Sequence, residues 1–147
     1  MIFQLHPQLE KDCINLGSLS LCRLLLMNDK QFPWFILVPE ITQITEIYQL
    51  NKQQQELLIA ESSALAECLT TLYKADKINI AAIGNLVPQL HIHHVVRYRT
   101  DIAWPAPVWG KFPAIPYSSQ ELTETVDSMK MTELMKKFSE LSKTGGV

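Results

Sequence analysis

Three of the four histidines of this 147-residue chain lie within four consecutive positions, as His91, His93 and His94. Alternate side chains of a β-strand share a face, so a strand here would carry on one face Gln89, His91, His93, Val95 and Arg97. An imidazole can act as a nucleophile or exchange a proton near neutral pH, and guanidinium and amide groups donate hydrogen bonds to anions. The row therefore predicts a site for an anionic substrate.

Two other interpretations of the histidine pair stay open at this point. Alternating histidines on a strand are also compatible with plain polar surface, and a His-x-His pair can form half of a zinc site. No further ligand at zinc-site spacing stands out: His6 is remote in sequence, and no spacing pattern marks Asp101 as a ligand. We therefore assign no metal.

Several residues near this row have both a functional and a structural interpretation. Arg97 could neutralise a phosphate or be a solvated charge at a strand end. Trp104 and Trp109, in a proline-rich stretch, could wall a base pocket or close a dimer, or simply anchor a rigid loop. Asp101 is expected to cap or salt-bridge that loop. Asn85 has two interpretations, a turn residue and a substrate ligand.

Composition excludes several classes of protein. The hydrophobic share of 47% and the length fit one globular domain. A net charge of −2 gives no positive field to attract nucleic acid or an anionic membrane. The three cysteines form no Cys-x-x-Cys pair, which argues against a disulfide framework or zinc knuckle and favours reduced thiols in the cytoplasm. We expect no signal peptide and no membrane span, because the apolar runs are only strand-length.

Periodicity and capping patterns predict the elements that must position the row. Strands are expected at 20–27, 34–38, 78–83 and 89–98, a short helical piece at 42–50, and helices at 52–74 and 118–141. The helices begin at capping-box patterns, Asn51 with Gln54 and Ser118 with Glu121. An ordered loop is expected at 101–116. This order favours an α+β domain with an antiparallel sheet over a doubly wound parallel one.

The stretch 84–97 resembles the signature of the histidine-triad (HIT) family, His-φ-His-φ-His-φ-φ after a glycine-containing turn, where φ is apolar. Asp29 and the run 34–39 are similar to the family's hairpin, and Asn79 lies where the family has Asn. The stretch 101–110 resembles a bacterial subgroup of HIT-like proteins. The resemblance implies a HIT-like fold: an antiparallel meander of about five strands with two main helices. We expect one domain over 1–147, with a core at about 18–117 and a C-terminal helix at about 119–141.

The resemblance also implies a chemistry. His91, the middle position of the triad, would attack the α-phosphate of a nucleotide ester, anhydride or phosphoramidate, and water would hydrolyse the nucleotidyl-histidine. His93 would contact phosphate or help the leaving group, Asp29 would lie near the ribose hydroxyls, and Asn79 would lie at the phosphate. The partners implied are a nucleotide or nucleotide conjugate and a second copy of the chain, whose sheet would continue this one. No cofactor is implied.

The sequence departs from the family pattern at three positions. Gln89 replaces the first triad histidine, Trp34 stands where a further histidine is common, and His94 occupies an apolar position. Glutamine can donate a hydrogen bond but cannot exchange a proton near neutral pH. A catalytically weak or inactive nucleotide-binding or interaction protein is therefore the alternative to a hydrolase or transferase. The predicted catalytic residues are His91, His93 and Gln89, and the predicted substrate-binding residues are Asp29, Asn79, Asn85, Arg97 and Trp34.

Overall fold

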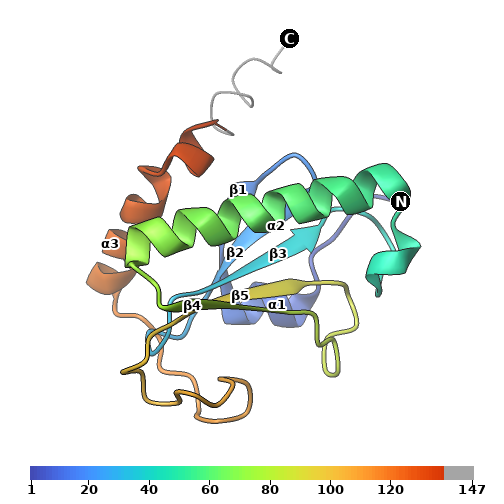
Figure 1. Ribbon diagram of the computed structural model, residues 1–147. Helices are drawn as coiled ribbons and strands as arrows, with labels where there is room; N and C mark the ends of the chain where they lie inside the picture. Colours follow the sequence, from blue (N-terminus) through green and yellow to red (C-terminus); the bar gives the residue numbers. More distant parts are fainter. Residues whose placement is uncertain (138–147) are drawn as a thin grey trace.

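Five strands form one antiparallel sheet in the computed structural model, which describes residues 1–137 (Figure 1). They are β1 (Cys13–Ser18), β2 (Cys22–Met27), β3 (Trp34–Pro39), β4 (Lys77–Ala81) and β5 (Ile92–Arg97). Their spatial order is β1-β2-β3-β5-β4, which differs from the simple meander expected. The long helix after β3 carries the chain across the sheet, so β4 begins at the outer edge and β5 returns to fill the place beside β3.

The helices confirm the predicted α+β class with two main helices. These are α2 (Lys52–Tyr73) and α3 (Ser119–Lys130). The shorter elements are α1 (Pro7–Asp12) and the 3-10 turn η1 (Ile47–Gln49). Of the helical piece expected at 42–50, only η1 is helical. α1 and β1 were not predicted. The sequence pattern of β1 is a weak strand signal because a glycine, Gly17, interrupts it. In the structure Gly17 has a φ of 116° and lies at a register shift that begins after Asn15.

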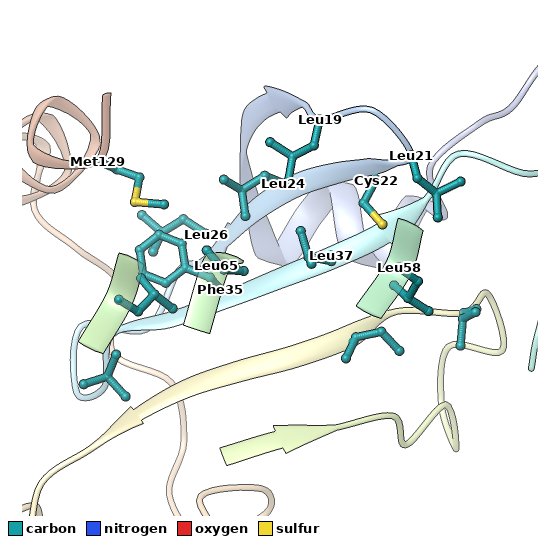
Figure 2. Packing of buried hydrophobic residues seen from close by; sticks show 14 of the residues in the cluster. Leu19, Leu21, Cys22, Leu24, Leu26, Phe35, Leu37, Leu58, Leu65 and Met129 are labelled. Atoms are coloured by element: carbon teal, nitrogen blue, oxygen red, sulfur yellow. The ribbon is translucent and has the colours of Figure 1, made fainter. Parts of the chain in front are cut away.

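Helix α2 covers one face of the sheet (Figure 1). Its start is the predicted capping box, in which Asn51 and Gln54 satisfy each other's backbone N–H groups. Leu58, Leu65 and Leu69 recur on one side of the helix and are buried. Figure 2 shows Leu58 and Leu65 packing beside side chains of β2 and β3, including Leu24, Leu26, Phe35 and Leu37.

The opposite face of the sheet has its own apolar cluster. It contains Leu9 of α1, the β3 residues Trp34 and Ile36, Val95 of β5, and Val108 of the loop that follows β5. Both faces of the central strands are therefore covered, and every residue of β3 and β5 is buried. This second face carries His93, so the loop and the N-terminal segment are the elements that enclose the candidate site.

The C-terminal helix is interrupted, whereas the sequence predicted one continuous helix over 118–141. α3 ends at Lys130, and a separate helical turn follows at 133–137. The interruption has a local cause: the Thr132 hydroxyl donates to the Met129 carbonyl and accepts from the Met135 N–H, which caps the second turn. The rest of the predicted helix, 138–141, lies outside the described residues. No helix within 1–137 is both long and apolar enough to cross a bilayer.

Candidate active site

The structure brings His91 and His93 together. β5 begins at Ile92, later than the predicted start at 89, so His91 immediately precedes the strand. The alternation of faces is as predicted: Leu90, Ile92 and Val96 join the cluster under α2, whereas Val95 joins the cluster on the other face. The two imidazole rings are 4.9 Å apart, centroid to centroid, and both residues are more than nine-tenths buried.

The hydrogen bond of His91 fixes its tautomer. Its Nδ1 lies 2.7 Å from the backbone carbonyl oxygen of Gln89. A carbonyl only accepts, so the proton of the neutral ring must be on Nδ1. The Nε2 atom then carries a lone pair, which is the form that a nucleophilic imidazole requires.

The hydrogen bond of His93 fixes the opposite tautomer. The indole Nε1 of Trp34 donates to His93 Nδ1 across 2.9 Å, and the two side chains are 59 positions apart in sequence. Indole only donates, so His93 Nδ1 carries no proton and the neutral ring holds its proton on Nε2. His93 is thus a hydrogen-bond donor beside the lone pair of His91.

Both Nε2 atoms are available to a ligand. Within residues 1–137 neither has a hydrogen-bond partner, yet neither is among the polar atoms sealed from solvent without one. The lone pair of His91 Nε2 can attack an electrophilic atom. The N–H of His93 Nε2 can donate a hydrogen bond to an electron-rich atom attached to that electrophile. A phosphoryl group offers both.

Burial keeps His93 and His94 uncharged. Burial, with smaller repulsions from His91 and His94, lowers the pKa of His93 from 6.5 to about 3. Burial also lowers the pKa of His94 to about 4, partly opposed by its hydrogen bond to the Ile92 carbonyl. His94 lies on the α2 side, where its Nε2 accepts from the Ser62 hydroxyl at 2.7 Å. His94 therefore joins β5 to α2 and does not face the site.

These two histidines are expected to make the protein acid-labile well above the carboxylate range. Each folded-state pKa lies below its unfolded value, so the unfolded chain binds more protons and stability is lost as pH falls from about 6.5 towards 4. By pH ~5 each histidine should remove about 2 kcal/mol from the free energy of unfolding. Urea unfolding at pH ~7.5 and ~5 measures this loss, and His94→Gln should roughly halve it. Equal stabilities at the two pH values would contradict the assignment.

The Gln89 side chain is occupied by the N-terminal segment. Its Oε1 accepts from the backbone N–H of His6 at 2.9 Å, and its Nε2 donates to the backbone carbonyl of Gln4 at 2.9 Å. A primary amide presents a donor and an acceptor side by side, and so can pair with both groups of one extended segment. The two nitrogens of an imidazole point apart and cannot do so. The backbone carbonyl of Gln89 thus accepts the hydrogen bond of His91. Its side chain holds the N-terminal segment at Gln4 and His6, and we call this pair of hydrogen bonds the clamp.

We expect Gln89→His, which introduces the first histidine of the histidine-triad signature, to release the N-terminal segment. Loss of these two hydrogen bonds, one part-buried and one exposed, should cost about 1 kcal/mol of stability and speed amide hydrogen exchange in residues 1–6. Hydrogen-exchange mass spectrometry measures the second effect. The control is Gln53→His on the exposed side of α2, which should change neither the stability nor the hydrogen exchange of residues 1–6. Unchanged exchange in the Gln89→His protein would show that the clamp is not what holds the segment.

Arg97 lies at the far end of β5 and holds the following loop. Its side chain is about 1% exposed and makes two hydrogen bonds to the Asp101 carboxylate, one to Asn79 Oδ1 and one to the Ala106 carbonyl. The guanidinium also lies over the Trp104 ring at 5.5 Å. Asn79, predicted at the phosphate, is thus paired with Arg97 here. Both residues brace the loop in this structure.

Asp101 completes this brace, as the sequence suggested. Its carboxylate accepts from the backbone N–H groups of Tyr98, Ala103 and Trp104 as well as from Arg97. The Arg97 hydrogen bonds and these backbone hydrogen bonds lower the pKa of Asp101, although burial opposes them. The loop therefore keeps an ionised carboxylate at its base.

The other two predicted binding residues, Asp29 and Asn85, lie in the segments that precede β3 and β5. Asp29 is buried at the β2–β3 turn, where its Oδ1 accepts from the backbone N–H groups of Gln31 and Ile115. Its Oδ2 has no partner within 1–137 and is not sealed from solvent. Asn85 is exposed in the turn before β5, next to Gly84, whose φ is 69°. No hydrogen bond or ion pair joins either residue to His91 in the described part of the chain.

Trp109 is a site neighbour that the sequence left ambiguous. Its ring lies 5.4 Å from that of His93 and 6.0 Å from that of Trp34, both edge-on. Its indole N–H is buried and has no partner in the described residues. A tryptophan in a proline-rich loop predicts a rigid aromatic contact. Its position in the sequence does not indicate which residue it contacts.

Other features of the described chain lie away from this site. No three His, Cys, Asp or Glu side chains within 1–137 are grouped so that they could hold a metal ion. A groove of about 780 Å³ lies between α2 and the C-terminal helical turns, next to residues such as Leu57, Cys68 and Leu134. It is on the α2 side of the sheet, away from His91 and His93.

Comparisons with known proteins agree on one family. The model of the HIT domain matches residues 8–100. A histidine triad protein from Marinobacter aquaeolei VT8 is similar in structure, with 48% identity, coverage of 94% of this chain and 99% of that chain, and a TM-score of 0.90. Those from Bradyrhizobium japonicum and Sinorhizobium meliloti 1021 have 38% and 41% identity. The match to the Bradyrhizobium japonicum protein covers 88% of this chain and 97% of that chain, with a TM-score of 0.86. The match to the Sinorhizobium meliloti protein covers 86% of this chain and 94% of that chain, with a TM-score of 0.84. No curated protein matches the chain.

Proposed function

Because this chain belongs to the HIT-domain family, we propose that it is a nucleotidyl hydrolase or transferase in which His91 is the nucleophile. The substrate would be a nucleotide ester, anhydride or phosphoramidate, and the first step would join its α-phosphorus to His91 Nε2. Water would then release the nucleoside monophosphate. Such a two-step route replaces one difficult displacement by two easier ones.

The observation that carries this proposal is the pair of opposite tautomers. The Gln89 carbonyl holds the His91 proton on Nδ1, which leaves the Nε2 lone pair free, and Trp34 leaves His93 with an Nε2–H. A nucleophile and a neutral donor are thereby set on adjacent rings 4.9 Å apart. Asp29 Oδ2 is proposed to accept from a ribose hydroxyl, and Asn85 to contact the substrate from the turn before β5.

We propose positioning rather than phosphate-binding roles for Arg97 and Asn79. The side chain of Arg97 is enclosed by Asp101, Asn79 and the Ala106 carbonyl, so its charge is already balanced. Gln89 is proposed to act through its backbone carbonyl. The homodimer implied by the family stays a prediction, for which β4 offers an outer sheet edge with a half-exposed Ile80.

A second candidate function is nucleotide binding without turnover. It is favoured by Gln89 and Trp34, because neither can exchange a proton near neutral pH and Gln89 is committed to the N-terminal segment. Loss of groups that orient or protonate can slow chemistry greatly while leaving binding intact.

The experiment that separates the two is direct trapping of the intermediate. The protein is incubated with adenosine 5′-phosphoramidate and, separately, with diadenosine polyphosphate, and AMP release is followed by chromatography. Intact-protein and peptide mass spectrometry search for an adenylyl group on His91. An adduct there, or steady AMP release, supports the hydrolase. Neither signal, in protein that binds AMP by calorimetry, supports the binding protein. Absence of AMP binding as well would overturn both for adenine nucleotides.

A further inference from the structure

Trp34 constrains His93 more tightly than a histidine at the same position would. Both side chains are buried, and they face each other diagonally across β3 and β5, since Trp34 pairs with Val95 and Ile36 with His93. The indole can only donate, so the bond to Nδ1 exists only while that nitrogen has no proton. An imidazole at position 34 could instead accept, and would tolerate a proton on either nitrogen of His93.

We propose that Trp34 is a positioning residue that keeps His93 an uncharged Nε2–H donor, and so restricts this site to leaving groups that depart as stable anions. This inference rests on the proposed nucleotidyl transfer to His91. It concerns which substrates that reaction can accept.

The surroundings of His93 give no support to a charged imidazolium. The rings against it are those of His91, Trp34 and Trp109, and His94 is adjacent in the chain. Within 1–137 no carboxylate forms a hydrogen bond or ion pair with it. Protonation of Nδ1 would both break the Trp34 bond and place an unpaired charge in a buried site, which is costly. His93 can therefore stabilise negative charge by hydrogen bonding but has no spare proton to give.

The first chemical step then runs without proton transfer. The lone pair of His91 Nε2 forms a bond to phosphorus, and the bond from phosphorus to the leaving-group oxygen breaks, with its electron pair remaining on that oxygen. The departing anion accepts a hydrogen bond from His93 Nε2–H. Water later attacks phosphorus, His91 recovers its lone pair, nucleoside monophosphate leaves and one proton passes to solvent.

Leaving groups divide into two classes under this mechanism. Carboxylates, phosphates and phenolates are stable as anions and can depart with hydrogen bonding alone. Alkoxides and alkylamines need a proton as the bond breaks, and a positioned acid usually contributes about 10²–10⁴-fold to such steps. Mixed anhydrides and aryl esters of a nucleoside monophosphate are therefore the favoured substrate class, and alkyl esters and alkyl phosphoramidates are disfavoured.

The first test examines the tautomer without any substrate. Nitrogen-15 NMR of the His93 ring should show one tautomer in the wild type, with the proton on Nε2, and a mixture of both in Trp34→Phe. The matched control is Trp109→Phe, which removes an indole N–H that has no acceptor within 1–137 and should leave His93 unchanged. A wild-type proton on Nδ1, or an unchanged tautomer in Trp34→Phe, would overturn the inference whatever the activity.

The second test measures the leaving-group preference as a ratio, which does not depend on the amount of active protein. The values of kcat/KM are compared for the nitrophenyl ester of AMP and for an alkyl phosphoramidate of AMP. We expect the wild type to prefer the ester by about 10²-fold or more, and Trp34→His to reduce that preference about tenfold or more, because two imidazoles can share a proton. A wild type that cleaves both equally would refute the inference while supporting the proposed function. No cleavage of either, with the tautomer as expected, would refute the proposed function and with it the substrate preference.

Discussion

Replacement of His91 by alanine is expected to abolish nucleotidyl transfer, with kcat falling about a thousandfold or more. The loss should be this large because the variant removes the only atom proposed to bond to phosphorus, and the neighbouring His93 holds a proton on Nε2 and cannot substitute for it. Steady-state AMP release and the adenylyl adduct, followed together, measure the effect.

Binding should survive the loss of chemistry. His91→Asn retains a polar side chain of moderate size and is expected to bind AMP with little change while forming no adduct. The matched control is His6→Asn, since the His6 ring only caps α1 by accepting from the Gln8 N–H, and asparagine is an equally good cap. Measurable turnover in His91→Ala above that of a blank would remove His91 from the mechanism.

The arrangement of the histidine row could be predicted because it follows from backbone geometry alone. Side chains alternate along any strand, so the apolar partners Leu90, Ile92 and Val96 determine which face is buried under α2 and which face His93 shares. The capping boxes of α2 and α3 were predictable for the same reason, since each depends on residues three positions apart. Local rules of this kind need no knowledge of the tertiary structure.

The hydrogen-bond partners of the row could not be predicted, because they come from distant parts of the chain. Trp34 is 59 positions from His93, and His6 is 83 positions from Gln89. From sequence, Gln89 and Trp34 are departures from a histidine pattern. In the structure Trp34 donates to His93, and Gln89 pairs with the N-terminal segment. These contacts give specific expectations about the tautomer of His93 and about the clamp at Gln89.

Arg97 shows the same limit for charged residues. Its side chain was expected to face the same way as His93, and a free guanidinium there would suit phosphate. The acceptors that enclose it come from β4 and from the loop after β5, at Asn79, Asp101 and Ala106. A strand pattern gives the direction of a side chain but not what already occupies the space in front of it.

Arg97→Met is accordingly expected to lower the free energy of unfolding by about 3–5 kcal/mol, the usual cost of removing one partner of a buried ion pair. The variant would leave the Asp101 carboxylate, whose side chain is 7% exposed, without its cation, and would remove the hydrogen bond to the Ala106 carbonyl. Urea unfolding measures the loss. The control is Arg99→Met, two positions along on the exposed surface, which should change stability by less than about 0.5 kcal/mol.

The double variant Arg97→Met/Asp101→Asn distinguishes an unpaired charge from lost packing. Asparagine at position 101 can still accept from the Tyr98, Ala103 and Trp104 N–H groups but carries no charge to leave unpaired. If the stranded carboxylate is the main cost, the double variant should be more stable than Arg97→Met by about 1 kcal/mol or more. Strictly additive losses would instead mean that Arg97 acts through its contacts with Trp104 and Phe32. Either way the loop that carries Trp109 to His93 depends on this residue, so turnover should fall together with stability.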